Sequence, residues 1–365
     1  MTKLSPRERY VRSMTGRDVD RPMYFLFWGP WASTWRRWQK EGMTFDSFSQ
    51  VISHFGADPL RNNVPINAGP CPAFERTILE QTDEWEVFID TWGIRRRNFR
   101  ASESMSEFIE FPIKNWDDWR KYKAERLDPH HPGRLAGPWR DKCRQWMQDE
   151  QIIRLGYFPD VGIFGSIRWL LGDEECLVSF YTQPDLVRDM MNHMTDIYVT
   201  VFEAVASEVR VDEIHIWEDM SGRQGPLISP AHWEEFMGPC YRRIRDVARR
   251  HDIPLISVDT DGNPDLIVPP MQNNGVNMLF PLEVAAGCDI NQFQARYPQM
   301  AFLGGIDKRA LAVGPAAIDA ELARIAPAVR NGRYIPALDH LVPDDVSWEN
   351  YCHYARSLAR LVGAG

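Results

Sequence analysis

Cysteine is scarce in this chain of 365 residues, and long hydrophobic runs are missing. The six cysteines are scattered and include no Cys-x-x-Cys pair, which favours free buried thiols over a disulfide framework. No stretch is long and apolar enough to span a bilayer. The opening stretch MTKLSPRERYVRSM is charged and amphipathic, unlike a secretory signal. We therefore expect a cytoplasmic protein that has no membrane partner.

An excess of positive charge is also missing. The formal net charge is −9, whereas nucleic-acid-binding proteins normally carry a basic face, so we expect no nucleic-acid partner. No GxGxxG or Walker loop follows an early strand, which disfavours a doubly wound nucleotide-binding fold. The hydrophobic fraction of 44% and the charged fraction of 25% are ordinary for a globular protein and exclude a largely disordered chain.

The sequence does contain a regular alternation of two kinds of segment. From residue 152 onward, amphipathic helical stretches separate the short apolar runs IIRLGYF, EIHIWEDM, PLISVDTDG, NMLFPLE, QMAFLGGID and RYIPALDH. Such alternation indicates parallel βαβ units, and this many in succession predicts an α/β protein with a (β/α)8 TIM barrel. Barrels of this kind often use a long chain as one unit, so we expect residues 1–365 to form a single domain.

Three segments before residue 152 add to this pattern. SPRERYVRSMTG has a serine cap, a proline at the first helical position and a terminal glycine, which predicts an N-terminal helical extension. PMYFLFWG is expected to be the first buried strand. DEWEVFIDTWGIRRRNF alternates apolar and polar residues on both sides of a turn near residues 91–93. This segment predicts a β-hairpin inserted over the mouth or the edge of the barrel.

Acidic residues follow five successive predicted strands. In a barrel all these strand ends lie on one face, which is the face that carries active sites. Capping of the next helix or a salt bridge could explain any one of these acids. Five together predict a functional ring that forms an electronegative pocket, with raised carboxyl pKa values or a bound cation. The residues are Glu218 and Asp219, Asp259 and Asp261, Glu283, Asp307, and Asp339 beside His340.

Several blocks of the sequence resemble the uroporphyrinogen decarboxylase superfamily. They are PRERYVRSMTGRDVDRPMYF, HIWEDM, GPLISPAHWEEFM, ISVDTDGN, LFPLEVAAGCDI, FLGGIDKRAL and YIPALDHLVPDDVSWENYCHY, and they span almost the whole chain. The resemblance implies a single (β/α)8 barrel. The superfamily also contains zinc-dependent methyltransferases that pass methyl groups between corrinoid proteins and thiols, and related methyltransferases of demethylating systems.

The chain departs from both known chemistries of the superfamily. The arginine-rich block with which the true decarboxylases hold a substrate bearing eight carboxylates is replaced by FWGPWASTWRRW, which keeps only Arg36 and Arg37. Because the expected pocket is also acidic, we do not expect uroporphyrinogen to be the substrate. The zinc ligands of the methyltransferases, a His-x-Cys pair and a later Cys, match Asp259, Asp261 and His340 or Asp339. Two oxygens and one imidazole suit zinc or another divalent transition metal, such as manganese or iron.

The leading hypothesis is a metal-assisted methyltransferase of a demethylating system that acts on a methylated small molecule, such as an aryl methyl ether. The methyl group would pass to a corrinoid protein or another carrier. The alternatives are a metal-free decarboxylase or lyase of a small aromatic acid, and a barrel that only binds a ligand or partner. Core packing remains the alternative role of the aromatic residues. The predicted site has Glu218, Asp307 and His340 as catalytic residues, Asp259, Asp261 and His340 as metal ligands, and Phe27, Trp28, Trp31, Trp217 and Glu283 as substrate-binding residues.

Overall fold

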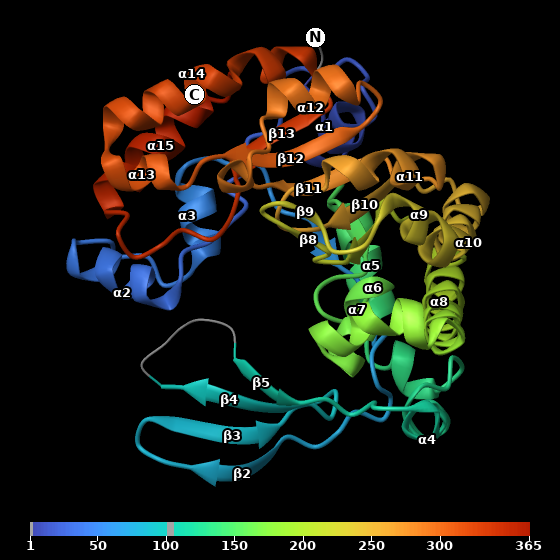
Figure 1. The fold of residues 1–365 in the computed structure, drawn as a ribbon. Coiled ribbons are helices and arrows are strands. Elements are labelled where there is room, and N and C mark those ends of the chain that lie inside the picture. Colours follow the sequence, from blue (N-terminus) through green and yellow to red (C-terminus); the bar gives the residue numbers. More distant parts are fainter. Residues whose placement is uncertain (1–2, 101–105) are drawn as a thin grey trace.

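A computed structural model describes residues 3–100 and 106–365 of the chain. Its centre is a curled sheet of seven strands in the order β1-β6-β7-β10-β11-β12-β13, in which every neighbouring pair is parallel (Figure 1). The carboxyl ends of all seven strands therefore lie along one edge. The strands are β1 (Asn62–Asn63), β6 (Ile153–Leu155), β7 (Glu213–Trp217), β10 (Leu255–Asp259), β11 (Met278–Leu282), β12 (Ala301–Ile306) and β13 (Tyr334–Leu338).

The predicted closed barrel is confirmed only as this parallel sheet of seven strands. The segment PMYFLFWG is buried as expected, but none of its residues pairs in a strand ladder. Its backbone instead bonds to neighbouring loops, because the Asp58 carboxylate accepts the Tyr24 N–H and the Tyr24 carbonyl accepts the Asp58 N–H, both at 2.9 Å. A single bridge joins Pro30 to Val342, which follows β13. The segment thus contacts residues beside both outer strands without forming an eighth strand.

Helices flank the sheet on its outer side (Figure 1). The predicted N-terminal helix is confirmed as α1 (Pro6–Met14), which Ser5 and Glu8 cap reciprocally. The other α-helices are α2 (Ala32–Lys40), α3 (Phe48–His54), α4 (Trp116–Arg126), α5 (Trp139–Gln148), α6 (Phe164–Leu171), α7 (Asp173–Thr182), α8 (Pro184–Ala206), α9 (Pro230–His232), α10 (Gly238–Arg250), α11 (Val268–Asn273), α12 (Ile290–Arg296), α13 (Arg309–Val313), α14 (Pro315–Asn331) and α15 (Trp348–Leu361).

Short elements connect these helices and strands. A π-turn, η2 (Trp233–Met237), links α9 to α10, and a small antiparallel ribbon follows β7. The ribbon consists of β8 (Ser221–Gly222) and β9 (Gly225–Pro226), and the 3-10 turns are η1 (Pro132–Leu135), η3 (Asp265–Ile267) and η4 (Val284–Ala286). In the described part of the chain, no helix combines the length and the apolar composition that a bilayer span requires. All six cysteines are free and buried, as the sequence predicted.

The predicted hairpin is confirmed and belongs to a larger antiparallel sheet. Strands β3 (Trp85–Ile89) and β4 (Arg95–Phe99) pair as expected, and β2 (Thr77–Gln81) and β5 (Glu107–Glu110) extend them to the order β2-β3-β4-β5. Figure 1 shows this sheet apart from the central one, at the bottom of the view. Its last strand brings aromatic side chains toward α6, next to the carboxyl end of β7.

Candidate active site

The carboxyl end of β10 carries the predicted pair Asp259 and Asp261. The carbonyl of Asp259 accepts the N–H groups of Glu218 (2.8 Å) and Asp219 (3.1 Å), which fixes the end of β7 against the end of β10. Burial, followed by the charges of Asp261 and Asp219, raises the pKa of Asp259 well above its usual range. Burial, followed by Asp219 and Glu283, raises the pKa of Asp261 to about 7. These four carboxyl groups therefore form one electrostatic cluster, as the sequence predicted.

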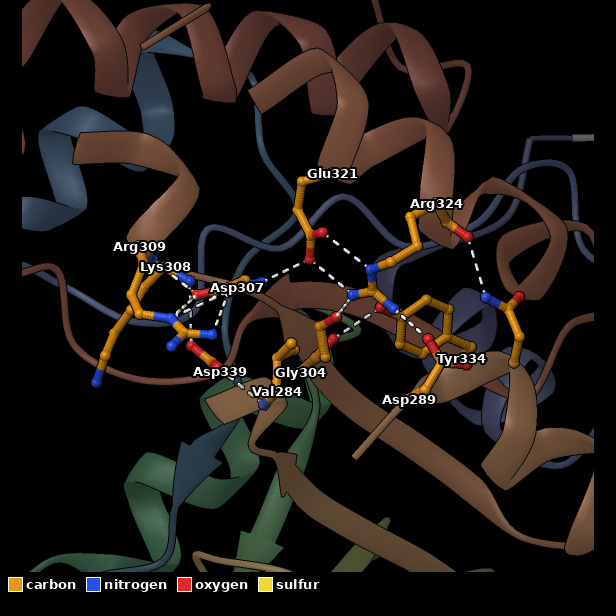
Figure 2. Close-up of polar contacts among 12 residues, drawn as sticks. Val284, Asp289, Gly304, Asp307, Lys308, Arg309, Glu321, Arg324, Tyr334 and Asp339 are labelled. Atoms are coloured by element: carbon orange, nitrogen blue, oxygen red, sulfur yellow. Dashed lines mark hydrogen bonds and ion pairs between the residues drawn. The ribbon is translucent and has the colours of Figure 1, made fainter. Parts of the chain in front are cut away.

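Asp339 and Lys308 lie at the ends of the next strands. The Asp339 carboxylate accepts the backbone N–H groups of Val284 (3.0 Å) and Lys308 (3.2 Å), so one side chain connects the ends of β11, β12 and β13 (Figure 2). Burial raises the pKa of Asp339 to about 6, although both of these bonds and the charge of Lys308 oppose the shift. Glu283, predicted to bind substrate, accepts the Gly262 N–H at 2.9 Å and so holds the turn after Asp261.

Arg324 of α14 supports these strand ends from outside the sheet. Its guanidinium group donates to the Gly305 carbonyl and to Asp289, both at 2.7 Å, and to Glu321 at 2.6 Å (Figure 2). Glu321 in turn accepts the Asp307 N–H at 2.7 Å. The network fixes the backbone that leads from β12 to Lys308.

His340 lies in a stack of aromatic rings. The Trp28 ring is stacked between Phe280 at 5.4 Å and His340 at 5.3 Å, and Phe27 meets both Trp28 and Phe280 edge-on. Burial, followed by the charge of Lys308, lowers the pKa of His340, which favours the neutral imidazole. Within the described residues, His340 Nδ1 and Trp28 Nε1 are buried and have no hydrogen-bond partner. Both atoms thus keep unused hydrogen-bonding capacity beside the acidic cluster.

The other two predicted substrate-binding aromatics lie in different places. Trp31 precedes α2, and its backbone N–H bonds to the Val342 carbonyl at 3.1 Å. Trp217 ends β7 and contacts Phe158 (4.8 Å between ring centroids) and Trp169 (5.4 Å). Trp28 is thus the predicted aromatic that stacks on His340, Phe27 packs behind it, and Trp217 belongs to a second aromatic group, so substrate binding by these side chains stays a prediction.

Glu218 has a structural environment that disfavours its predicted catalytic role. Its carboxylate is fully buried and accepts the N–H groups of Ile163, Phe164 and Gly165 and the Tyr241 hydroxyl. These four bonds occupy both oxygens and fix the start of α6, which leaves little capacity for a metal or a substrate. Burial nevertheless raises the pKa of Glu218 to about 7, because it outweighs the four bonds.

Asp307 has the ion-pair role that the sequence had left open. Both carboxylate oxygens bond to the Arg309 guanidinium group, at 2.7 Å for the closest contact, and Asp307 also accepts the Arg309 N–H. These hydrogen bonds to Arg309 outweigh burial and lower the pKa of Asp307. A carboxylate that is ionised and paired is a poor general acid, so we do not retain Asp307 in the catalytic set.

A buried polar chain behind the acidic cluster was not foreseen from the sequence. Glu213 bonds to Arg61 (2.9 Å) and to the Ser257 hydroxyl (2.5 Å), and that hydroxyl contacts His215 Nδ1 at 2.7 Å. His215 Nε2 lies 3.6 Å from the Asp259 carboxylate. The signal in the sequence was the period-two placement of polar residues in EIHIW, which puts Glu213 and His215 on the same face of β7.

The predicted metal ligands are not brought together as a set. Asp259 and Asp261 interact, but His340 is stacked on Trp28 and responds to the charges of Lys308, Glu283 and Asp219. Among residues 3–100 and 106–365, no three His, Cys, Asp or Glu side chains are placed to share a metal ion. The arrangement therefore does not fit a three-ligand site, and binding of zinc or another divalent transition metal stays a prediction.

The parallel sheet and its acidic carboxyl edge define an α/β protein of the type that carries its functional residues at the strand ends. The chain belongs to the uroporphyrinogen decarboxylase (URO-D) family, whose model matches residues 172–360. This confirms the resemblance seen in the sequence.

One solved structure of low sequence identity shares the fold over the whole chain. A methyltransferase from Methanosarcina mazei is similar over 98% of this chain and 99% of its own, with a TM-score of 0.63 and 13% identity. A B12-independent methionine synthase from a Shewanella species has a TM-score of 0.40 and 11% identity, and covers 63% of this chain and 67% of its own. Among curated proteins, none matches the chain. The similarity to the first structure extends over the whole chain and shows the fold alone.

Proposed function

We propose that this protein is a methyltransferase of a demethylating system, which removes a methyl group from an oxygen atom of a small molecule at the carboxyl edge of the central sheet. The observation that supports the proposal is the pair Asp259 and Asp261, two neighbouring half-buried carboxyl groups, of which the first has a pKa raised well above its usual range and the second a pKa raised to about 7. Demethylation requires a proton for the oxygen that loses its methyl group, and such carboxyl groups can hold that proton at neutral pH.

The proposed step can be written with its atoms balanced. The methyl group passes to a nucleophile on the acceptor, and the electron pair of the broken C–O bond stays on the substrate oxygen. Asp261 gives that oxygen its proton, and burial together with the charges of Asp219 and Glu283 keeps Asp261 protonated. The acceptor in this proposal is a corrinoid carried by a partner protein, or another methyl carrier. His340 and Trp28 position the substrate through their unpaired ring nitrogens.

A decarboxylase or lyase that acts on a small aromatic acid is the second candidate. Arg61 favours it, because this buried guanidinium group lies over the rings of Phe27 (4.9 Å) and Phe280 (5.5 Å). Its Nε and Nη2 atoms have no hydrogen-bond partner in the described part of the chain. A carboxylate that entered this region could pair with them.

A mixture of two labelled substrates separates the two functions. 2-Methoxyphenol with a labelled methyl carbon and hydroxybenzoate with a labelled carboxyl carbon would be incubated with the protein and reduced cobalamin as acceptor. Methylated cobalamin and catechol are expected from the wild-type protein, with a loss of about 10²-fold or more in Asp261→Asn. The matched control is Asp307→Asn, which removes a carboxylate that is already paired with Arg309 and should stay active. Labelled CO2 with an intact methyl group would instead establish the lyase.

A further inference from the structure

A cavity of about 490 Å³ lies between the antiparallel sheet and the carboxyl end of β7. Four aromatic side chains line it. Phe108 belongs to β5 and Phe111 directly follows that strand, Trp169 belongs to α6, and Trp217 belongs to β7. The Phe108 ring is stacked with Phe111 (5.8 Å, 13°) and meets Trp169 edge-on (5.6 Å, 73°). A cavity of this size can hold a substituted ring, since about 150 Å³ suffices for benzene.

The cavity reaches the acidic cluster through Asp219. This residue lines the cavity, and its backbone N–H donates to the Asp259 carbonyl at 3.1 Å. The charge of Asp219 also acts on Asp259 and Asp261. A molecule in the cavity therefore has one end next to Asp219, the residue that links the cavity to the carboxyl groups to which the proposed function assigns the chemistry.

The charged groups around the cavity are already paired with one another. Arg168 Nη2 bonds to Asp219 at 2.5 Å, and Arg168 Nε lies 3.7 Å from Asp173. The guanidinium group of Arg96 lies over both Phe108 (4.4 Å) and Trp169 (4.3 Å) and is itself paired with Asp90. Arg96 already covers one face of Phe108 and of Trp169, and Arg168 already neutralises the carboxylates of Asp219 and Asp173. A cationic ligand would therefore gain little from these groups, so the cavity favours an uncharged ligand.

We propose that this cavity is the binding site for a neutral aromatic ring of the substrate, and that the methyl-bearing oxygen on that ring points past Asp219 to Asp259 and Asp261. This inference rests on the proposed function and specifies its substrate class as an uncharged aryl methyl ether. The ring edges and faces of Phe108, Trp169 and Trp217 offer the offset and edge-to-face contacts that aromatic rings prefer.

Binding to the full chain, measured by isothermal titration calorimetry, tests the site without turnover. The probes are 2-methoxyphenol, its saturated counterpart methoxycyclohexane, and the cation phenyltrimethylammonium. We expect 2-methoxyphenol to bind at least about tenfold more tightly than either of the others. Absence of saturable binding of 2-methoxyphenol, or equal binding of the saturated or the cationic probe, would overturn the proposal.

Two variants of β5 locate the binding site. Phe108→Leu keeps an apolar side chain but removes the ring, and we expect it to lower the affinity for 2-methoxyphenol by about tenfold. The matched control is Ile109→Ala, whose side chain alternates to the other face of β5 and lines a second cavity, which has Phe111 in common with the first. It should bind the probe like the wild-type protein, and a melting curve of each variant confirms that it is folded. Unchanged affinity in folded Phe108→Leu would overturn the assignment.

The outcome also separates this site from the proposed reaction. Ring binding that depends on Phe108, without any methyl transfer, would leave the site intact and refute the reaction. Methyl transfer from 2-methoxyphenol with the same KM in the wild-type protein and in Phe108→Leu would leave the reaction intact and refute the site.

Discussion

Burial and neighbouring negative charges together raise the pKa of Asp261. Its pKa is raised from the usual value of 3.8 to about 7, so the folded protein binds more protons than the unfolded chain between these pH values. The free energy of unfolding should therefore fall as the pH rises through this window. A carboxyl group that destabilises its own protein in the ionised state is typical of a functional position.

Asp261→Asn tests this reasoning at the same residue. The amide cannot ionise, so we expect the free energy of unfolding at pH 8, from urea denaturation, to rise by about 1–3 kcal/mol. The pH dependence that this carboxyl contributes between about 4 and 7 should disappear. The proposed methyl transfer, which we expect to decline in the wild-type protein as the pH rises through about 7, should be lost. A variant that is less stable at pH 8 would show that the carboxylate is held by contacts that favour its charge.

Replacing Glu218 by its amide should lower the free energy of unfolding, in contrast to the same change at Asp261, although the pKa of Glu218 is also raised. Glu218→Gln places an NH2 group against at least one of the three backbone N–H donors at the start of α6. We expect a loss of about 2–4 kcal/mol in the free energy of unfolding, measured by urea denaturation, because buried donors would face each other. The control is Glu235→Gln, at a surface ion pair with Arg188, which should change the stability by less than about 1 kcal/mol. Similar stabilities of the two variants would contradict the structural role.

The sequence predicted the acidic residues at the strand ends but not their separate roles. The apolar run before Asp259 was enough to place both aspartates at the carboxyl end of β10, because the strand ends at Asp259 and Asp261 follows two residues later. The role of Glu218 depends on α6, which lies more than 50 residues earlier in the chain. The role of Asp307 depends on the rotamer that Arg309 adopts. The apolar and polar alternation of a strand predicts neither the contacts of Glu218 with α6 nor the ion pair of Asp307 with Arg309.

At the scale of elements, strand β12 passes close to β11 at Gly304. This residue pairs with Leu282 and has a φ of +108°, and a Cβ atom there would lie 3.0 Å from the Leu282 nitrogen. Only glycine meets both demands, the close approach and the positive φ, without strain. The two consecutive glycines of FLGGID are thus explained by packing between strands, whatever the chemistry of the site.

Gly304→Ala should lower the free energy of unfolding by about 1–3 kcal/mol, because it adds a backbone clash to an unfavourable φ. Gly287→Ala is the control, since Gly287 has a φ of +88° but no atom within 4 Å of the added Cβ. The difference between the two variants, measured by chemical denaturation, isolates the cost of the clash. Equal losses would show that β11 and β12 separate easily at this point.

The elements that the sequence mispredicted lie outside the regular alternation. PMYFLFWG has the composition of a strand, but the Asp58 carboxylate satisfies the backbone N–H of Tyr24 that a neighbouring strand would otherwise bind. Strands β2 and β5 were missed because β2 is exposed along its whole length and β5 is short, so neither shows an apolar alternation.

The molecule as a whole carries a net charge of −9. Five carboxyl groups lie together at the carboxyl edge of its central sheet, those of Asp219, Asp259, Asp261, Glu283 and Asp339. The organisation of residues 1–365 as one domain and a cytoplasmic location stay predictions. The metal ion expected from the sequence does not fit the geometry of the described residues, and this disagreement can be tested on the intact protein.

Metal analysis of the purified protein should show the same content, well below one ion per chain, in the wild-type protein, in Asp261→Ala and in His340→Ala. The reason is that the described side chains do not bring three donors together, and two carboxylates alone hold a transition metal weakly. One ion per chain in the wild-type protein that is lost in both variants would contradict this expectation and support the metal-assisted reaction.

The two phenylalanine rings of the cavity and the carboxyl groups come from different stretches of the chain. Phe108 and Phe111 belong to or follow the antiparallel sheet between Thr77 and Glu110, whereas Asp259 and Asp261 belong to the central sheet. Recognition and chemistry can therefore change independently in evolution. An exchange of residues 77–110 for the matching segment of a relative would transplant a ligand preference and leave the reacting groups in place.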